Sequence, residues 1–297
     1  HGNIEIAVAA VKQGAYDFLE KPFNTDQLIV VIKRALEASR LRREIAELRR
    51  SELVESNMIG NSSSFNNLKS QLDKVSKSNS RVMLTGPAGC GKEIAARYIH
   101  ANSVRASSPF VSVSSANIES DKVEEVLFGS EYNGEVKSGL LEKANGGFLF
   151  FDEVADMPKG TQSKILRVLV EQAFTRVNGC NLVRVDLRVI SSTNKNLISK
   201  ISLGEFREEL YHRLNVVPIK VPSLENRRED IPVLANHFVK LLNLSEGLPI
   251  RSFSEGALTK LQTMSWPGNI RQLRNAVEQI LILGPNNGEI DSSELPE

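Results

Sequence analysis

The sequence predicts an α/β fold in which parallel strands carry polar side chains to one edge of a sheet. Three stretches support this. Residues 82–99 read as a strand, a glycine-rich turn and a helix, residues 146–153 contain an apolar strand that ends in two carboxylates, and residues 187–194 contain a third apolar strand that ends in polar side chains. Four consecutive apolar residues are typical of a strand buried on both faces. Because open α/β sheets bind ligands at the carboxyl ends of their strands, we expect a ligand site there.

Length and composition set the limits of this interpretation. A chain of 297 residues can hold two or three folded units. The net charge of +1 neither favours nor excludes a nucleic-acid partner. The two cysteines, Cys90 and Cys180, make no disulfide framework, which fits a reducing cytoplasm. No apolar run approaches the roughly 20 residues that span a bilayer, and no signal peptide is visible, so we expect no membrane contact.

The first 37 residues are expected to fold as helix, short strand and helix, with the strand at residues 15–19 and the second helix at 27–36. The simplest interpretation of Lys21-Pro22 is a turn. The stretch from Ala10 to Phe23 nevertheless closely resembles the end of a response-regulator receiver domain, in which the lysine matching Lys21 contacts the phosphorylated aspartate. Only the last third of a receiver is covered, and the first residue is His1 rather than Met. We therefore expect a piece of a longer protein, without the phosphoacceptor aspartate.

From Lys33 to Glu55 the sequence is charged and free of glycine and proline, which predicts a continuous helix, and its part 38–56 is assigned to a linker. Leu41, Ile45 and Leu48 have the spacing of a short dimeric coiled coil. A solvated linker helix that packs on its own domain explains the pattern equally well, and both alternatives stay open.

The glycine-rich loop is the first candidate for chemistry. Small residues let backbone N–H groups surround phosphate oxygens, and the following helix adds the partial positive charge of its N-terminus. Lys92 would then reach the terminal phosphates, while Glu93 stands where a Ser or Thr that touches Mg²⁺ is usual. The candidate binding residues of the loop are Gly86, Pro87, Ala88, Gly89, Cys90, Gly91, Lys92 and Glu93.

The second and third strands add candidate catalytic groups. Asp152 can hold Mg²⁺ on the phosphates, and Glu153 can polarise an attacking water, which together indicate a nucleoside triphosphatase site. An isolated Asp-Glu pair would be a solvated strand end, but here it follows a phosphate-binding loop. Asn194, after the third strand, is placed to sense a terminal phosphate.

Three arginines complete the set of candidates. Arg207 and Arg213 lie six residues apart, so simple helical spacing does not place them on one face, and one or both could reach a neighbouring subunit's nucleotide as arginine fingers. Isolated arginines of this kind are usually surface residues. Arg271 falls in the first turn of a helix that starts at Asn269, where a cation is poorly placed for the helix dipole. This position indicates a role in holding phosphate.

Taken together, these stretches resemble the AAA+ domain of the NtrC family, the activators of the alternative sigma factor sigma-54. The match runs from about Met58 to Leu283. It includes Leu127-Phe128-Gly129, Ser192-Thr193-Asn194, the block from Phe206 to Leu214, residues 227–231 and Trp266-Pro267-Gly268-Asn269.

The resemblance implies a P-loop α/β subdomain at residues 57–221, an α-helical lid at 222–284 and a loop-like tail at 285–297. It also implies ATP and Mg²⁺ as ligands, Ile59 as a nucleotide contact, Arg271 as the lid sensor, and Arg207 and Arg213 as trans-acting fingers in a ring. A receiver remnant and a linker before the domain give the order of a response regulator. A sensor histidine kinase would act on the receiver, and a DNA-binding helix-turn-helix would follow, although the chain stops at Glu297 before any such motif.

Two intervals depart from the family pattern. Activators carry a loop reading Gly-Ala-Phe-Thr-Gly-Ala that touches the sigma factor, whereas residues 130–139 are shorter, polar and charged. Ser114 stands where activators have an asparagine that restrains the catalytic glutamate, and serine is too short for the same hydrogen bond. Loss of the loop inside an intact domain resembles the NtrX branch of the family.

Two candidate functions therefore remain. The favoured one is a two-component regulator of transcription whose AAA+ domain binds ATP, with weak or incidental hydrolysis and no sigma-54 contact. The alternative is a mechanochemical ATPase that remodels sigma-54 polymerase through a different loop. A scaffold that binds no nucleotide is disfavoured by the phosphate-binding loop. A dimer through the linker or receiver and a hexameric ring both stay open.

Overall fold

The computed structural model describes residues 16, 24–25, 28–37, 39–40, 58–114, 122–132 and 134–296. The chain divides into two compact units, His1–Glu55 and Ser56–Glu297. In the first unit residues 28–37 are helical, in agreement with the helix predicted at 27–36. Of the receiver-like segment 10–23 only Tyr16 is described, and Lys21-Pro22 and most of the linker helix also lie outside the described residues. These remain predictions.

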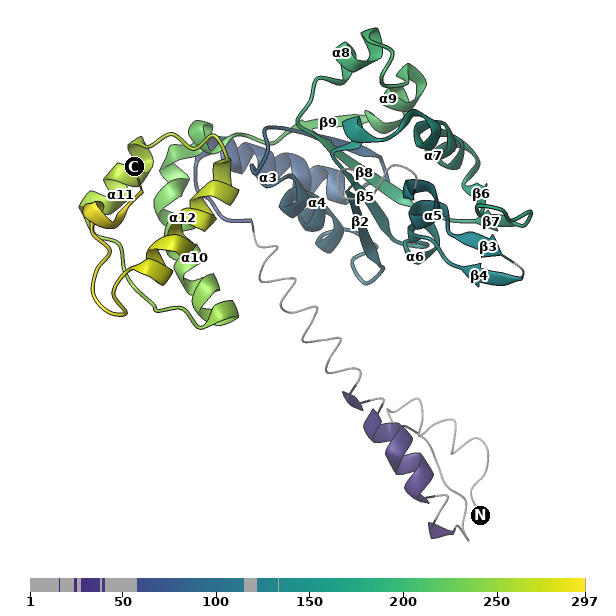
Figure 1. The fold of residues 1–297 in the computed structure, drawn as a ribbon, viewed down its shortest axis with the longest axis horizontal. Coiled ribbons are helices and arrows are strands. Elements are labelled where there is room, and N and C mark those ends of the chain that lie inside the picture. Colours follow the sequence, from purple (N-terminus) through teal and green to yellow (C-terminus); the bar gives the residue numbers. More distant parts are fainter. Residues whose placement is uncertain are drawn as a thin grey trace. The chain divides into compact units, whose positions relative to one another are not determined.

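The second unit is built on a parallel sheet of five strands in the order β2-β5-β8-β1-β9 (Figure 1). This sheet confirms the predicted α/β class, and each of the three predicted strands is part of it. The strands are β1 (Val82–Thr85), β2 (Phe110–Ser114), β5 (Phe148–Asp152), β8 (Arg188–Thr193) and β9 (Val217–Lys220).

Strand β8 is longer than the apolar run from which it was predicted. The apolar run 187–190 predicts a strand that ends at residue 190, yet Ser191, Ser192 and Thr193 are buried and continue it. They pair in parallel with residues 83–85 of β1. Backbone pairing between two central strands thus outweighs the polar character of these side chains.

The strands send alternate side chains into two separate cores, one on each face of the sheet. Phe148 and Phe150 pack in the cluster formed with α3 and α4, whereas Leu149 and Phe151 pack in the cluster formed with α5 to α9 (Figure 1). All four side chains are at most 1% exposed, so β5 is the buried centre of a three-layer α/β/α arrangement. The helices are α3 (Ser63–Ser76), α4 (Lys92–Ala101), α5 (Val123–Phe128), α6 (Leu140–Lys143), α7 (Lys159–Glu171), α8 (Leu197–Ser202) and α9 (Glu208–Leu214), with a 3₁₀ turn η2 (Val154–Asp156) after β5.

Two short hairpins lie outside the main sheet. Strands β3 (Ser130–Tyr132) and β4 (Glu135–Lys137) form one, and β6 (Ala173–Thr175) and β7 (Leu182–Arg184) form the other. The N–H of Glu131 donates to the carbonyl of Val177 (2.9 Å), which joins the two hairpins. Asn133 and Gly134 separate β3 from β4, and Asn-Gly strongly favours a two-residue hairpin turn. The polar interval 130–139 therefore contains a closed hairpin.

The helical lid follows β9. It consists of a 3₁₀ segment η3 (Leu224–Asp230), α10 (Ile231–Glu246), α11 (Glu255–Thr263), α12 (Asn269–Leu283) and a 3₁₀ turn η4 (Ser292–Glu294). These elements share one apolar core. The segment 285–297, expected as a loop-like tail, contributes to that core through Ile290 and Leu295, which are 0% and 5% exposed. Arg251 also forms an ion pair with Glu294 (2.8 Å), so at least residues 290–295 pack with the lid. None of the helices that the structure describes combines the length and apolar character needed to cross a bilayer.

A buried carboxylate joins the lid to the start of the α/β subdomain. Asp230 is 0% exposed and accepts hydrogen bonds from the N–H of Asn61 (2.6 Å), the N–H of Ser62 (2.8 Å) and the hydroxyl of Ser62 (2.7 Å). The neighbouring Arg227, also buried, donates to the carbonyl of Cys90 (3.0 Å). Burial lowers the pKa of the Arg227 guanidinium, and the charge of Asp230 opposes this shift. The pair thus connects the lid both to α3 and to the loop before α4.

We predict that Asp230→Ala lowers the free energy of unfolding by about 3 kcal/mol, because it leaves three donors without their acceptor in a buried site. Urea unfolding measures the effect. Asp186→Ala is the control, since it breaks only the ion pair of Arg105 with a carboxylate that is 72% exposed, and it should cost less than about 1 kcal/mol. Equal costs in the two variants would contradict the role assigned to Asp230.

Candidate functional site

The glycine-rich loop at residues 86–91 lies between β1 and α4, as predicted; it is the candidate phosphate-binding loop and is called the phosphate-binding loop below. Gly91 directly precedes α4 with φ of 100°, a left-handed conformation that glycine adopts without steric cost. Lys92, the first residue of α4, is only 6% exposed. Its ammonium group donates to the carbonyls of Gly86 (3.0 Å) and Pro87 (3.3 Å), so the lysine folds back over the loop that precedes it.

Glu153 faces Lys92 from the end of β5. Their charged groups are 3.0 Å apart, and the other carboxylate oxygen of Glu153 accepts from the N–H of Asn194 (2.8 Å). Glu153 has φ of 52°, an uncommon left-handed conformation for a residue with a side chain. Such strain persists where surrounding contacts enforce it. Lys92 and the backbone of Asn194 therefore hold Glu153, to which Ser114 was expected to be too short to bond as the family asparagine does.

Asp152 occupies the last position of β5 and accepts a hydrogen bond from the hydroxyl of Ser192 (2.5 Å). The same hydroxyl accepts from the N–H of Glu153 (3.2 Å), so Ser192 of β8 orders both acidic residues. In the sequence, Ser192 is marked only by its place in the family motif Ser192-Thr193-Asn194. Its role depends on β8 lying next to β5, which a single strand's pattern does not reveal.

The acidic edge suits Mg²⁺ only together with a nucleotide. Mg²⁺ retains waters and commonly takes one or two carboxylates plus phosphate oxygens. Asp152 supplies one such carboxylate. Within the described part of the chain no group of three or more His, Cys, Asp or Glu side chains could hold a metal ion. Phosphate oxygens would have to complete the coordination.

Two predicted loop residues have other contacts. The carboxylate of Glu93 pairs with Arg97 one turn later on α4 (3.0 Å) and is exposed. Cys90 is 1% exposed, and burial raises the pKa of its thiol. Neither side chain contacts Lys92 or Glu153 through a hydrogen bond or ion pair in the described part of the chain, so these two residues can serve a phosphate through their backbone N–H groups.

The start of α12 packs against the phosphate-binding loop. The N–H of Ile270 donates to the carbonyl of Gly89 (3.0 Å), and the side-chain amide of Asn269 donates to the carbonyl of Ala88 (2.9 Å). A Cβ on Gly89 would lie 2.2 Å from the carbonyl oxygen of Gly268 and 3.2 Å from the Cβ of Arg271. Arg271 thus lies beside the loop with an exposed side chain. Ile59 and Ile270 both pack against the apolar core of the lid.

The two proposed finger arginines lie away from this cluster, at the two ends of α9. Arg207 directly precedes the helix, and its N–H donates to the side chain of Gln162 on α7 (2.9 Å). Arg213 is in the last turn, and its carbonyl accepts from Arg81 (3.3 Å). Both arginine side chains are exposed, and among the described residues neither forms an ion pair or a hydrogen bond with the phosphate-binding loop.

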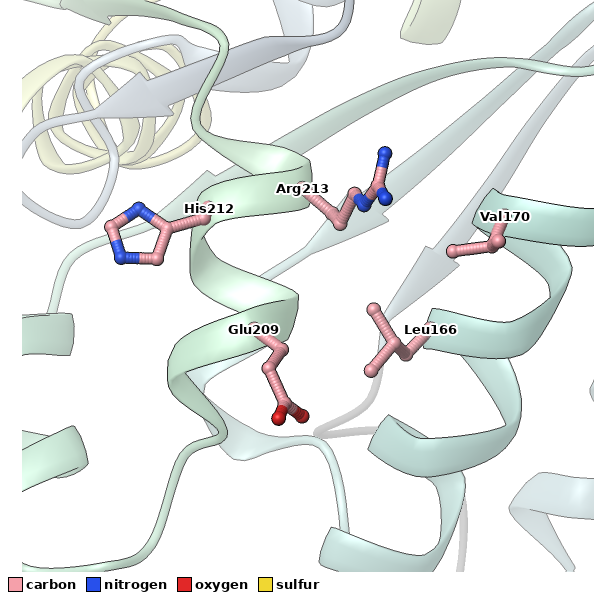
Figure 2. A pocket seen from close by; sticks show the side chains of 5 residues that line it. All are labelled: Leu166, Val170, Glu209, His212 and Arg213. Atoms are coloured by element: carbon pink, nitrogen blue, oxygen red, sulfur yellow. The ribbon is translucent and has the colours of Figure 1, made fainter.

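Helices α7 and α9 border an open groove of ≈ 560 Å³. Figure 2 shows Glu209 and Arg213 extending from α9 toward Leu166 and Val170 of α7. Gln162, which is 0% exposed, crosses between the helices at one end, since its amide nitrogen also donates to the carbonyls of Met157 (2.8 Å) and Glu205 (3.0 Å). No sequence pattern marked this glutamine, because its partners come from two separate segments, at residue 157 and at residues 205–207.

Comparison with protein families finds a sigma-54 interaction domain at residues 58–220 and an AAA+ ATPase lid domain at residues 225–297. The first match alone covers more than half of the chain. The lid match continues through the predicted tail, in line with the packing of Ile290 and Leu295 on the lid core.

The chain is also similar to larger regulators. It is 52% identical over 301 residues to the nitrogen assimilation regulatory protein NtrX of Azorhizobium caulinodans, an alignment that covers 100% of this chain and 66% of that protein. Among solved structures it is similar to NtrX from Brucella abortus, with 51% identity, a TM-score of 0.90 and coverage of 100% of this chain and 67% of that chain. The same protein in complex with ATP matches with 50% identity, a TM-score of 0.86 and coverage of 100% and 65%. The chain thus spans about two thirds of the length of these relatives.

We predict that Gly89→Ala destabilises the chain by about 1–3 kcal/mol more than Gly204→Ala, because only the first adds a clash with the lid. The two glycines have similar φ, +73° and +68°, so both variants share the left-handed backbone cost. Nothing lies within 4 Å of a Cβ on Gly204. Urea unfolding of both variants gives the difference, and equal values would mean that loop and lid are not in contact in solution.

Proposed function

Because the chain belongs to the NtrX/NtrC-like response regulators with a sigma-54 interaction AAA+ domain, we propose that it is the ATP-binding part of a two-component regulator of transcription. In this proposal the domain lacks the sigma-54-contacting loop and transmits a signal or an assembly state to a DNA-binding domain. One observation carries the proposal. An ordered phosphate-binding edge occurs in the same domain as a short closed hairpin at residues 130–137.

Nucleotide binding rests on the residues of that edge. Lys92 has its ammonium group between loop carbonyls and Glu153, and Arg271 lies beside the same loop. NtrX from Brucella abortus, which is 50% identical over the aligned region, was solved in complex with ATP. In the proposal Lys92 and the backbone of residues 86–93 bind the phosphates, Asp152 holds Mg²⁺ through the nucleotide, and Ile59 and Arg271 contribute from the lid side.

The hairpin argues against a sigma-54 contact. Strands β3 and β4 pair in antiparallel fashion, and Tyr132 donates to Glu125 of α5 (2.8 Å). The hairpin is also fastened to Val177 through backbone hydrogen bonds. A segment held this closely to its own domain does not project as an apolar, aromatic-tipped loop would. In the proposal the domain therefore uses ATP for assembly or signal transmission.

A working ring ATPase is the second candidate. It is favoured by the retention of Glu153, held by Lys92 and Asn194, and by Arg207, whose backbone is fixed by the buried Gln162. Fixed arginines at the end of a helix suit a trans-acting finger, which stabilises charge on a transferred phosphoryl group. In this alternative, hydrolysis in a ring would remodel sigma-54 polymerase through a surface other than the usual loop.

The remaining parts of the proposal concern the longer protein. A sensor histidine kinase would phosphorylate a complete receiver, and a helix-turn-helix beyond the lid would bind DNA. Self-association would occur through the linker helix or the receiver, or in a ring. In the proposal the protein acts on DNA in the cytoplasm.

We predict that Lys92→Ala abolishes ATP binding, whereas Glu153→Gln leaves it within a few-fold of the unsubstituted chain. The first change removes the cation of the phosphate-binding loop, and the second keeps the size and hydrogen-bonding ability of the side chain. Isothermal titration calorimetry with ATP and Mg²⁺ measures both. Equal losses in the two variants would contradict the roles assigned to them.

Steady-state ATP hydrolysis measured against protein concentration separates the two functions. The proposal predicts a flat, near-background rate per subunit together with measurable ATP binding. A rate that rises with concentration and collapses in Arg207→Ala, but not in the surface control Arg167→Ala, would favour the ring ATPase.

A second test concerns the sigma factor. We expect no stable capture of sigma-54 by the chain in complex with ATP-hydrolysis transition-state analogues. Stable capture in a pull-down would replace the first function with the second.

A further inference from the structure

Asn269 occupies an unusual place at the start of α12. It is 3% exposed and has φ of 54°, the left-handed region that asparagine tolerates better than most residues. It is enclosed by three segments that are far apart in the sequence, namely the phosphate-binding loop, the beginning of η3 and the Pro267-Gly268 turn. A helix start that is both strained and buried requires contacts that hold it there.

Both ends of the Asn269 side chain are fully used. The amide nitrogen donates to the carbonyl of Ala88 (2.9 Å) and to that of Pro267 (3.2 Å), which accounts for both of its hydrogens. The amide oxygen accepts from the N–H of Leu224 (2.8 Å). Aspartate would lose the donors and leucine would lose every bond, so only an asparagine of this length satisfies the three backbone groups.

These bonds join parts that must move together if the lid responds to a nucleotide. Ala88 lies within the phosphate-binding loop, Leu224 begins the segment that leads into the lid, and Arg271 follows Asn269 by two residues. Because Arg271 is exposed beside Gly89, its position depends on how the start of α12 sits on the loop.

We infer that Asn269 is a positioning residue that locks the lid to the phosphate-binding loop, so that a phosphate group bound in the loop sets the position of α12 and Arg271. The inference rests on the proposed nucleotide binding. Coupling between two sites is reciprocal. If a bound nucleotide stabilises the position of the lid, then a change that loosens the lid must lower the affinity for the nucleotide.

The chain contains a built-in reporter of this junction. Trp266 is the single tryptophan, is 6% exposed, and accepts a hydrogen bond at its carbonyl from the N–H of Asn269 (2.8 Å). Its indole N–H donates to the carbonyl of Leu261 (2.8 Å) within the lid. When ATP shifts the loop, Asn269 carries the start of α12 with it and changes the surroundings of this indole, so ATP should alter its fluorescence.

The test measures ATP affinity by calorimetry and the change in Trp266 emission at saturating ATP, in Asn269→Gly, Asn269→Asp and Asn243→Asp. The glycine variant tolerates the left-handed backbone and removes the amide. The Asn269→Asp variant keeps the acceptor for Leu224 and loses the donors. Asn243→Asp is the matched control, because it removes an amide donor to the carbonyl of Leu248 (2.7 Å) inside the lid, away from the loop.

We expect both Asn269 variants to bind ATP at least about tenfold more weakly and to lose the emission change, while the control behaves as the unsubstituted chain does.

Charge repulsion alone would weaken ATP binding by Asn269→Asp yet leave its emission change intact, and that result would overturn the inference. So would an unaltered response in Asn269→Gly, or the absence of an emission change in an unsubstituted chain that binds ATP. If Asn269→Gly does not fold, Asn269→Asp decides. An unsubstituted chain that binds no ATP would overturn the proposed function, and this inference with it.

Discussion

The arrangement of the site depends on the ammonium group of Lys92, which is almost fully buried. A buried cation requires counter-charge and hydrogen-bond acceptors. Lys92 obtains the acceptors from the loop after β1 and the counter-charge from Glu153 after β5, and the backbone beyond β8 then holds Glu153. These strands are neighbours in the sheet, in the order β5-β8-β1, so the strand order brings Lys92, Glu153 and the backbone after β8 together. A change in that order would separate the lysine from its counter-charge, Glu153.

The parts of this assembly that local pattern encodes could be predicted from the sequence. The loop between β1 and α4 is marked by its glycines, and β5 by four apolar residues before Asp152. The end of β8 could not be predicted, because Ser191 and Ser192 resemble the polar residues of a strand end. Their place in the strand follows from pairing with β1 on one side and β5 on the other, which is a property of the whole sheet.

The polar residues that join distant segments are even harder to predict from local sequence pattern. Asn269 meets Ala88 across 181 positions, and Asp230 meets Asn61 across 169. Gln162 bonds to residue 157, which precedes it in the sequence, and to residues 205 and 207, which follow it, and no periodic pattern links these segments. In sequence these residues resemble ordinary surface polar residues, and only burial shows that each satisfies several backbone groups at once. Ser114 gives the converse case. Its difference from the family asparagine was visible in sequence, but the partners that hold Glu153 instead were not.

The energetic cost of these features bears on function. A buried lysine and left-handed conformations at Glu153 and Asn269 all destabilise a fold that serves only as a scaffold. All three lie at the phosphate-binding edge and at the start of the lid that contacts it. The β3–β4 hairpin, by contrast, is held by strand pairing and by hydrogen bonds to its own domain. The domain therefore retains energetically unfavourable polar features where a nucleotide would bind. Where the family loop would contact sigma-54, it carries a hairpin that is bonded to its own domain. Nucleotide-dependent coupling between loop and lid is the function that this distribution of cost supports best.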